Sequence, residues 1–162
     1  MSGEEHSYGG PVTVEIEAQR AYGSQAPDVV STMADLTDPD VRGRLTPAAL
    51  TGLLRIAELW HLTDAEVVAL LGDSISVPTL RRWRRRPPAT LSVDQLERCS
   101  LIAGIHRALG VLLSPEHAHA WVTRPNSGPL YGGRRPLDVM IRGRMSGLAA
   151  VRRHLDAVRG GG

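Results

Sequence analysis

Between residues 46 and 158, apolar side chains recur at spacings of three and four in successive stretches, most of which open with a helix-capping pattern. An α-helix completes a turn in ~3.6 residues, so this spacing places the apolar side chains on one face of a helix. The opening patterns are Thr46-Pro47, Thr63-Asp64-Ala65-Glu66, Ser92 and Ser114-Pro115. The sequence therefore predicts an all-α fold.

The same signals give approximate bounds for the helices. We expect helices over residues 46–62, 63–72, 77–86, 92–113 and 146–158, with two short ones from Ser114 and over residues 136–143 between the last two. Gly72 should end the second helix with a positive φ, because glycine adopts that conformation at little cost. Proline, glycine, asparagine and serine are dense in residues 124–133, which predicts a loop.

Charge is distributed unevenly along the chain. All 19 basic residues are arginine, and 17 acids leave a net charge of +2. Residues 1–40 hold eight of the acids and one arginine, whereas the remaining 122 residues hold 18 arginines and nine acids. An acidic segment with scattered glycine and proline is typical of a mobile tail. We therefore divide the chain into a mostly flexible acidic tail (residues 1–44), a helix-turn-helix domain (45–90) and a second helical domain (91–162).

One segment of the tail departs from that description. Residues 12–17 alternate apolar and polar side chains, as a short strand does. A single strand needs a partner to be stable, so this segment is either an arm that docks on another chain or a β-prone coil. The net negative charge of the tail also raises the hypothesis that it folds over a basic part of the chain.

The composition argues against several classes of protein and site. A lone Cys99 makes no internal disulfide and supplies too few thiolates for zinc, which favours the reducing cytoplasm. His117 and His119 lie on different faces of a helix, so we expect no metal site. We also expect no signal peptide and no membrane span, because no apolar run approaches ~20 residues. No nucleophile–base pattern or phosphate-binding glycine loop occurs, so we expect neither catalysis nor a cofactor.

Five arginines fall within residues 81–86, interrupted by Trp83. A short helix, a glycine turn and an arginine-rich second helix are typical of a helix-turn-helix, whose second helix enters the major groove of DNA. Leu80 and Trp83 should face the core. The side chains expected to contact phosphates or base edges are Ser76, Thr79, Arg81, Arg82, Arg84, Arg85 and Arg86. The nearest acids in the sequence are Asp73 and Asp94, too few to neutralise the cluster.

The competing interpretation of the arginine cluster is a solvated basic helix, or one that pairs with the acidic tail. The helix-turn-helix pattern and the short length that Pro87-Pro88 imposes favour DNA binding. The interval from Gly72 to Thr79 is longer than the three to four residues of the simplest helix-turn-helix turns, which counts against it.

The C-terminal half carries a particular order of landmarks, from Trp121 through Pro125-Asn126 and Gly133 to Pro136-Leu137-Asp138. This order resembles the W-x-x-x-P-N … G-x-x-P-L-D signature of the Xre/MbcA/ParS-like toxin-binding family, the antitoxins of RES-domain toxins. Upstream, Thr79-Leu80 with Trp83 resembles the start of the family's recognition helix, and Leu96-Glu97-Arg98 resembles the opening of its central helix. The resemblance covers about residues 46–160.

This resemblance implies an Xre-like helix-turn-helix domain that binds the operator of its own operon, followed by a small helical domain that binds the toxin. RES-domain toxins of the family use NAD, and their antitoxins obstruct the NAD pocket with C-terminal elements. The implied toxin-binding residues are Trp121, Pro125, Asn126, Leu130, Gly132, Pro136, Leu137 and Asp138. Four of these have side chains that also suit the core of that domain, which is the interpretation we favour: Trp121, Leu130, Pro136 and Leu137. Further toxin contacts are expected at Arg142, Arg144, Arg152, Arg153, Arg159 and Gly160.

Two functions remain in competition. The first is an antitoxin that neutralises a RES-domain toxin and represses its operon. The alternative is a stand-alone helix-turn-helix transcriptional regulator whose C-terminal half dimerises or senses a ligand. Both predict DNA binding that weakens steeply with salt, and both favour a homodimer, because dimers commonly bind two half-sites. A RES-domain toxin encoded in the neighbouring gene would decide for the first.

Overall fold

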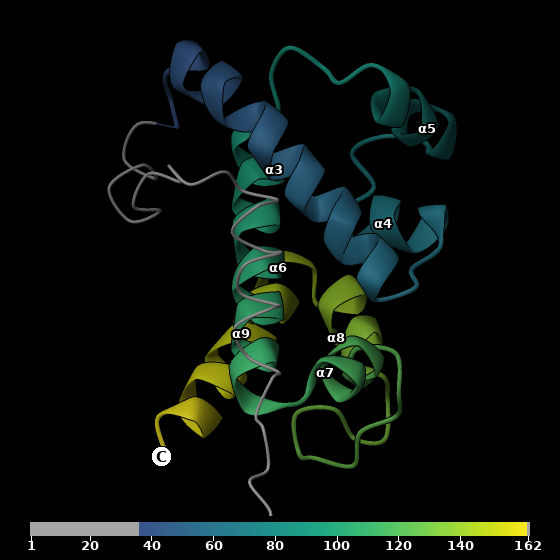
Figure 1. Ribbon diagram of the computed structural model, residues 1–162, viewed down its shortest axis with the longest axis vertical. Helices are drawn as coiled ribbons and strands as arrows, with labels where there is room; N and C mark the ends of the chain where they lie inside the picture. The colour runs from purple at the N-terminus through teal and green to yellow at the C-terminus, as the bar shows by residue number, and fades with distance from the viewer. Residues whose placement is uncertain (1–35, 162) are drawn as a thin grey trace, which may run out of the picture.

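The computed structural model describes residues 36–161, and within them the backbone forms helices and no strand. The helices, labelled as in Figure 1, are α3 (Pro39–Leu59), α4 (Asp64–Leu70), α5 (Val77–Arg85), α6 (Val93–Leu112), α7 (Pro115–Trp121), α8 (Pro136–Arg142) and α9 (Arg144–Arg159). The predicted all-α fold is thus confirmed for the described residues. The predicted strand over residues 12–17 and most of the predicted tail lie outside them.

Helix α6 is the centre of the arrangement. Both α3 and α9 pack against it, and α8 packs against α9 (Figure 1). Helices α4 and α5 lie together on the right in Figure 1, and α4 also contacts α8. That contact joins the helix-turn-helix to the C-terminal part of the chain. No helix in residues 36–161 is long and apolar enough to cross a membrane.

The first described helix begins earlier than the sequence predicts. We expected Thr46 to cap a helix that starts at Pro47, but both residues lie inside α3. The cap is Asp38, whose carboxylate accepts a hydrogen bond of 2.8 Å from the backbone amide of Asp40, with Pro39 at the first helical position. Asp38-Pro39 and Thr46-Pro47 are two versions of the same start signal. Residues 39–44, assigned to the tail, are therefore helical.

Thr46 has a different structural role from the one predicted. Its side chain is fully buried, and its hydroxyl donates to the carbonyl of Arg42 at 2.8 Å. The same oxygen accepts a 2.8 Å hydrogen bond from the backbone amide of Leu91, in the segment that precedes α6. Since a buried amide without an acceptor is costly, Thr46 fixes the position of that segment against α3.

We predict that Thr46→Val lowers the free energy of unfolding by about 1–3 kcal/mol, because the amide of Leu91 then stays buried without an acceptor. Thr46→Ser keeps the hydroxyl and loses a methyl group, so it should cost about 0.8 kcal/mol or somewhat more. Urea unfolding followed by circular dichroism measures both. A Thr46→Val protein as stable as the Thr46→Ser protein would contradict this assignment.

The predicted capping box at Thr63 is present, and the predicted cap Ser92 also forms a capping box. The Thr63 hydroxyl accepts from the Glu66 amide at 3.2 Å, and the Glu66 carboxylate accepts from the Thr63 amide at 2.9 Å. Ser92 and Gln95 make the same reciprocal pair at the start of α6. Ser114 precedes α7 as predicted but makes no capping bond with its side chain, because its hydroxyl lies 2.7 Å from His117 Nδ1.

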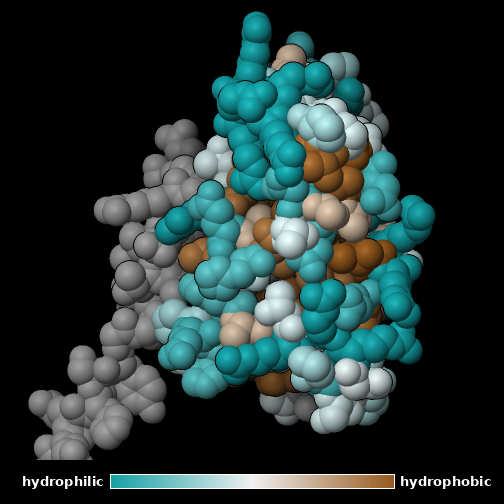
Figure 2. All heavy atoms as spheres, turned by 90° about the vertical axis from the view of Figure 1, so that its right-hand side faces the viewer, coloured by the Kyte–Doolittle hydropathy of each residue, from teal (hydrophilic) through white to brown (hydrophobic). Residues whose placement is uncertain are grey.

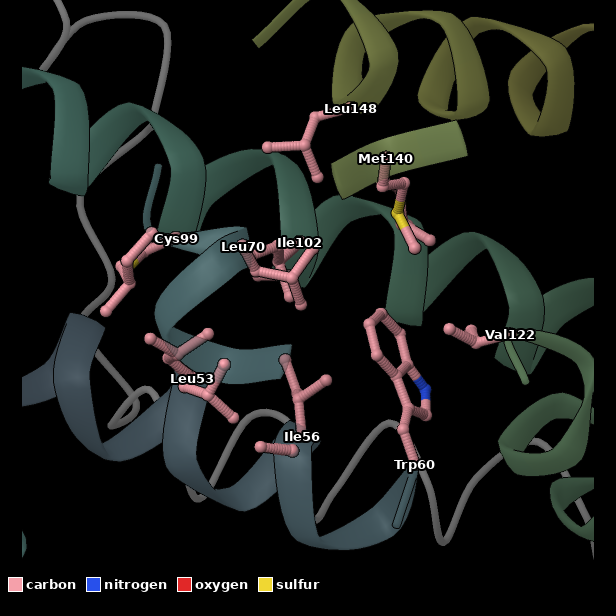
Figure 3. Packing of buried hydrophobic residues seen from close by; sticks show 14 of the residues in the cluster. Leu53, Ile56, Trp60, Leu70, Cys99, Ile102, Val122, Met140 and Leu148 are labelled. Atoms are coloured by element: carbon pink, nitrogen blue, oxygen red, sulfur yellow. The ribbon is translucent and has the colours of Figure 1, made fainter. Parts of the chain in front are cut away.

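The core runs through most of the helices. Figure 3 shows Leu53 of α3 and Trp60, which follows α3, on one side of the cluster, with Met140 of α8 and Leu148 of α9 on the other side and Ile102 of α6 between them. Trp60 is completely buried. Of the side chains predicted to face inward on the last helix, Leu148, Val151 and Leu155 are buried, but Val158 is 51% exposed. Val158 lies at the end of α9, where the neighbouring helix no longer covers it.

Helices α8 and α9 approach each other closely because of a glycine. Gly143 alone separates them, and a Cβ on Gly147 would clash with the backbone carbonyl of Val139. Gly147 therefore lets the first turn of α9 rest directly on α8. Arg144, the first residue of α9, has a φ of 53°, an uncommon value for a residue with a side chain.

Candidate nucleic-acid interface and partner-binding domain

The turn between α4 and α5 reverses the chain through two left-handed residues. Gly72 has a φ of 74°, as predicted, and Asp73 follows at 55°. A Cβ on residue 72 would lie 2.8 Å from the guanidinium carbon of Arg98, so a side chain there would strain the backbone and displace the end of Arg98. The turn thus depends on a side chain from α6.

Two side chains of α6 hold this turn. Gln95 uses its amide oxygen in the capping box and donates with Nε2 to the Ser74 hydroxyl at 2.9 Å. Arg98 is 5% exposed, pairs with Asp94 at 2.7 Å and donates to the Leu70 carbonyl at 3.3 Å. Leu70 ends α4, where helix carbonyls lack helical partners. Neither contact was predicted, because each joins residues more than 20 positions apart in the sequence.

Helix α5 presents one apolar edge to the core. Leu80 is fully buried and Trp83 is 9% exposed, which confirms the predicted inward face. Ser76 caps the helix by accepting from the Thr79 amide at 3.3 Å, and the two hydroxyls lie 3.0 Å apart. Both predicted contact residues therefore stand at the start of α5 and take part in its capping.

The arginines of α5 divide into two groups. Asp64, the first residue of α4, accepts from Arg81 Nε with Oδ2 at 2.9 Å and from Arg84 Nη2 with Oδ1 at 2.8 Å. These bonds hold the pKa of the Asp64 carboxyl below its usual value. The sequence pointed instead to Asp73 and Asp94 as the nearest acids, and Asp94 pairs with Arg98. Asp64 lies far from the cluster in sequence and was missed.

The second group is Arg82, Arg85 and Arg86. All three are exposed, and no acidic side chain in residues 36–161 forms an ion pair with them. Figure 2 shows the face on which α5 lies, with hydrophilic side chains gathered at its upper end, the height of α5 in Figure 1. This part of the surface offers guanidinium groups to an anionic ligand.

The loop between α7 and α8 is held by its own hydrogen bonds. The Asn126 amide donates to the Arg134 carbonyl at 3.0 Å, and the Gly133 amide donates to the Asn126 carbonyl at 2.9 Å. The Asn126 side chain accepts from the Gly128 amide at 2.8 Å. Tyr131 is buried beneath the loop, with its ring edge-on to Trp121 at 5.5 Å and to His154 at 5.4 Å.

The predicted toxin-binding residues of this domain have different exposures. Pro136 and Leu137 are buried, in accord with the core interpretation, and Trp121 is half-buried. Leu130 is 37% exposed, so the core interpretation is wrong for this residue. Leu130 stands next to Tyr131, which takes the buried position of the loop instead. Of the remaining loop positions, Pro125 and Gly132 are exposed and Asn126 is half-buried.

Asp138 does not stand free on α8. Its carboxylate accepts from Arg135 Nη2 at 2.7 Å and from Nε at 3.0 Å, and these bonds hold its pKa below the usual range. Arg135 also donates to Glu66 of α4 at 3.2 Å. Because Glu66 is part of the α4 capping box, this arginine connects the helix-turn-helix to the C-terminal domain.

The arginines of α8 and α9 also fall into two groups. Arg152 pairs with Asp156 at 2.8 Å, and Arg159 approaches the same carboxylate at 3.7 Å. Arg142, Arg144 and Arg153 are exposed, and no ion pair involves them in the described part of the chain. Gly160 is exposed beyond the end of α9.

Buried rings meet where α3, α6 and α7 converge. His106 is 2% exposed, and its ring centroid lies 6.0 Å from both Trp60 and His119. Burial, together with the charges of His119 and Arg107, lowers the pKa of His106 to about 4. Within residues 36–161, no group of three histidine, cysteine or acidic side chains is placed to hold a metal ion.

Comparison with known proteins identifies both halves. A family model described as the antitoxin Xre-like helix-turn-helix domain matches residues 42–104. A second, the antitoxin Xre/MbcA/ParS C-terminal toxin-binding domain, matches residues 108–161. The uncharacterized protein y4oB of Sinorhizobium fredii (strain NBRC 101917 / NGR234) is 36% identical over 126 residues, or 77% of this chain and 95% of that protein. No solved structure matches the chain. The chain therefore belongs to the Xre/MbcA/ParS family of toxin–antitoxin antitoxins, with a DNA-binding helix-turn-helix followed by a toxin-binding domain.

Proposed function

We propose that the chain neutralises a RES-domain, NAD-using toxin in the cytoplasm by obstructing its active site, and that it represses its own operon by binding operator DNA through α5. The observation that carries the DNA-binding half is the outward side of α5, where Arg82, Arg85 and Arg86 have no acidic partner among residues 36–161. Arginine pairs with phosphate through its planar fork and reads guanine through the same fork.

Charge supports the toxin-binding half of the proposal. Residues 100–161 contain nine arginines and three acids, and two of the acids pair with arginines of the same domain. Arg142, Arg144 and Arg153 remain exposed, and Leu130 adds an exposed apolar side chain on an ordered loop. An ordered loop loses little entropy on binding. We therefore place the toxin on this basic surface and expect acids on the facing surface of the toxin.

A homodimer suits the DNA-binding half. Helix α5 spans residues 77–85, and a helix this short buries little surface in a groove. Proteins of this kind bind as dimers whose recognition helices meet two half-sites about one turn of DNA apart. The corresponding operator should be a pseudopalindrome.

Co-expression with the product of the neighbouring gene tests the proposal. Cells that express that product should survive when this chain is present, and the two proteins should co-purify. Loss of NAD in cells without this chain would show that the toxin consumes NAD. If survival is independent of this chain and no complex forms, the antitoxin function fails and a stand-alone transcriptional regulator is the function that remains.

Deleting residues 159–162 should weaken toxin binding at least tenfold, about 1.4 kcal/mol, because an arginine next to small residues fits a nucleotide pocket that binds phosphate. Calorimetric titration of the purified toxin and growth rescue both measure the effect. Arg159→Ala separates the arginine from the glycines that follow it. Unchanged affinity and rescue by the truncated chain would show that these residues do not enter the toxin.

A further inference from the structure

Asp64 makes an unusual pair of contacts for a surface carboxylate. Its Oδ2 accepts a hydrogen bond from Arg81, and its Oδ1 accepts one from Arg84. Both arginines belong to the helix expected to contact DNA. Its side chain is 25% exposed, against 63% for Arg81 and 32% for Arg84. One carboxylate thus holds two of the five arginines.

The position of Asp64 is fixed independently of these arginines. Asp64 is the first residue of α4, directly after the Thr63 cap, and the capping box is closed by Glu66. Glu66 is held in turn by Arg135 at 3.2 Å. A carboxylate on so well anchored a helix end can hold an arginine in place, whereas an isolated surface ion pair adds little to stability. The effect of Asp64 should therefore be larger in ligand binding than in folding stability.

Sequence-independent DNA binding depends on the number of phosphates that arginine and lysine neutralise. Each neutralised phosphate adds ~0.9 to the slope of log affinity against log salt concentration. An arginine held by a carboxylate must give up that partner before it binds a phosphate, and the released carboxylate then repels the DNA. Arginines without a partner contribute in full.

We propose that Asp64 is a specificity-determining residue: it withholds Arg81 and Arg84 from phosphates, so that the DNA-contacting charge of α5 is confined to Arg82, Arg85 and Arg86. This inference rests on the proposed binding of DNA by α5. Its consequence is weaker binding to non-operator DNA, because two of the arginines contribute little to the sequence-independent attraction. Operator contacts made by the remaining arginines are then a larger share of the total affinity.

The test uses the full chain and a fluorescent 25-base-pair duplex of random sequence, with affinity measured by anisotropy across a series of KCl concentrations. Asp64→Asn removes the charge and keeps the side-chain size. We expect Asp64→Asn to bind more tightly at low salt and to steepen the salt slope by about 1.8, the value for two added phosphates. Its advantage over the wild type should therefore shrink about tenfold between about 50 and 200 mM salt.

Two further variants make the result specific. Asp73→Asn makes the same change of charge in the adjacent turn, where Asp73 is exposed and has no ion pair in residues 36–161, so its slope should stay at the wild-type value. Combining Asp64→Asn with Arg81→Gln and Arg84→Gln should also return the slope to the wild-type value. Melting temperatures of all variants confirm that they are folded.

The inference is overturned if Asp64→Asn has the wild-type slope, if Asp73→Asn matches it, or if the triple variant keeps the steeper slope. In each of these cases the wild-type chain still binds DNA, so the proposed function stands. A wild-type chain that shows no salt-dependent binding to the duplex would overturn the proposed DNA binding as well.

Discussion

Replacing Arg82 and Arg85 with glutamine is expected to weaken binding to operator DNA at least thirtyfold and to leave toxin binding unchanged. Both side chains are exposed on α5, and their loss removes no ion pair within residues 36–161. A good arginine contact to a base contributes about 1–3 kcal/mol, and two such contacts therefore account for about 2 kcal/mol or more. If the arginines contact phosphates instead, the salt slope should fall by about 1.8.

The measurement is anisotropy on a duplex taken from the region upstream of the gene, together with titration of the toxin. Arg142→Gln with Arg153→Gln is the matched control, because it removes the same charge from exposed positions on the C-terminal domain. That control should retain DNA binding and weaken toxin binding. If the two pairs of substitutions weakened DNA binding equally, net charge and not α5 would govern it.

The second large effect is expected from His106: lowering the pH should reduce the free energy of unfolding. The ring lies between Trp60 and His119, and its buried Nδ1 has no hydrogen-bond partner among residues 36–161. Burial lowers the pKa of His106 to about 4, against 6.5 for an unperturbed histidine. The unfolded chain therefore binds a proton between these two values while the folded chain does not, and stability falls as pH falls through this window.

The size of the loss follows from the shift in pKa. At ~1.4 kcal/mol per pKa unit, the folded state should lose about 2–3 kcal/mol between pH 7 and pH 4.5. Urea unfolding at a series of pH values measures this loss. Acids with lowered pKa values, Asp64 and Asp138, are lost as stabilising groups at still lower pH, so the comparison is made above pH 4.5. His106→Gln should be less stable at pH 7 and lose less stability on acidification. Parallel pH profiles for the two proteins would contradict the role of His106.

Capping patterns predicted the start of a helix correctly where all the capping interactions lie within one turn. The capping boxes at Thr63 and Ser92 and the positive φ of Gly72 all involve residues within one turn, so the sequence contains the complete interaction. The first helix was misplaced because two equivalent start signals compete. The earlier one prevails with help from Arg42, which donates to the carbonyls of Leu36 and Thr37.

Contacts between residues far apart in the sequence could not be predicted from the spacing of residue types. The capping pattern identified Asp64 as a helix-start residue, but its approach to Arg81 depends on how α4 crosses α5. Periodicity likewise identified the apolar faces without showing where a neighbouring helix stops covering them, as at Val158. The resemblance to the antitoxin family located the two functional halves, and the division of the arginines into held and exposed groups required the structure.

Helix α6 restricts how the helix-turn-helix and toxin-binding halves of such antitoxins can be recombined. The helix-turn-helix match ends at residue 104 and the toxin-binding match begins at residue 108, both inside α6. The start of this helix fixes the recognition turn through Gln95 and Arg98, while α9 packs against the same helix. The two halves therefore cannot be exchanged as independent units. A chimera that joins halves of two parents needs a junction inside α6. The two parents must supply a glutamate and an arginine at the positions of Glu66 and Arg135 to keep the ion pair between the halves.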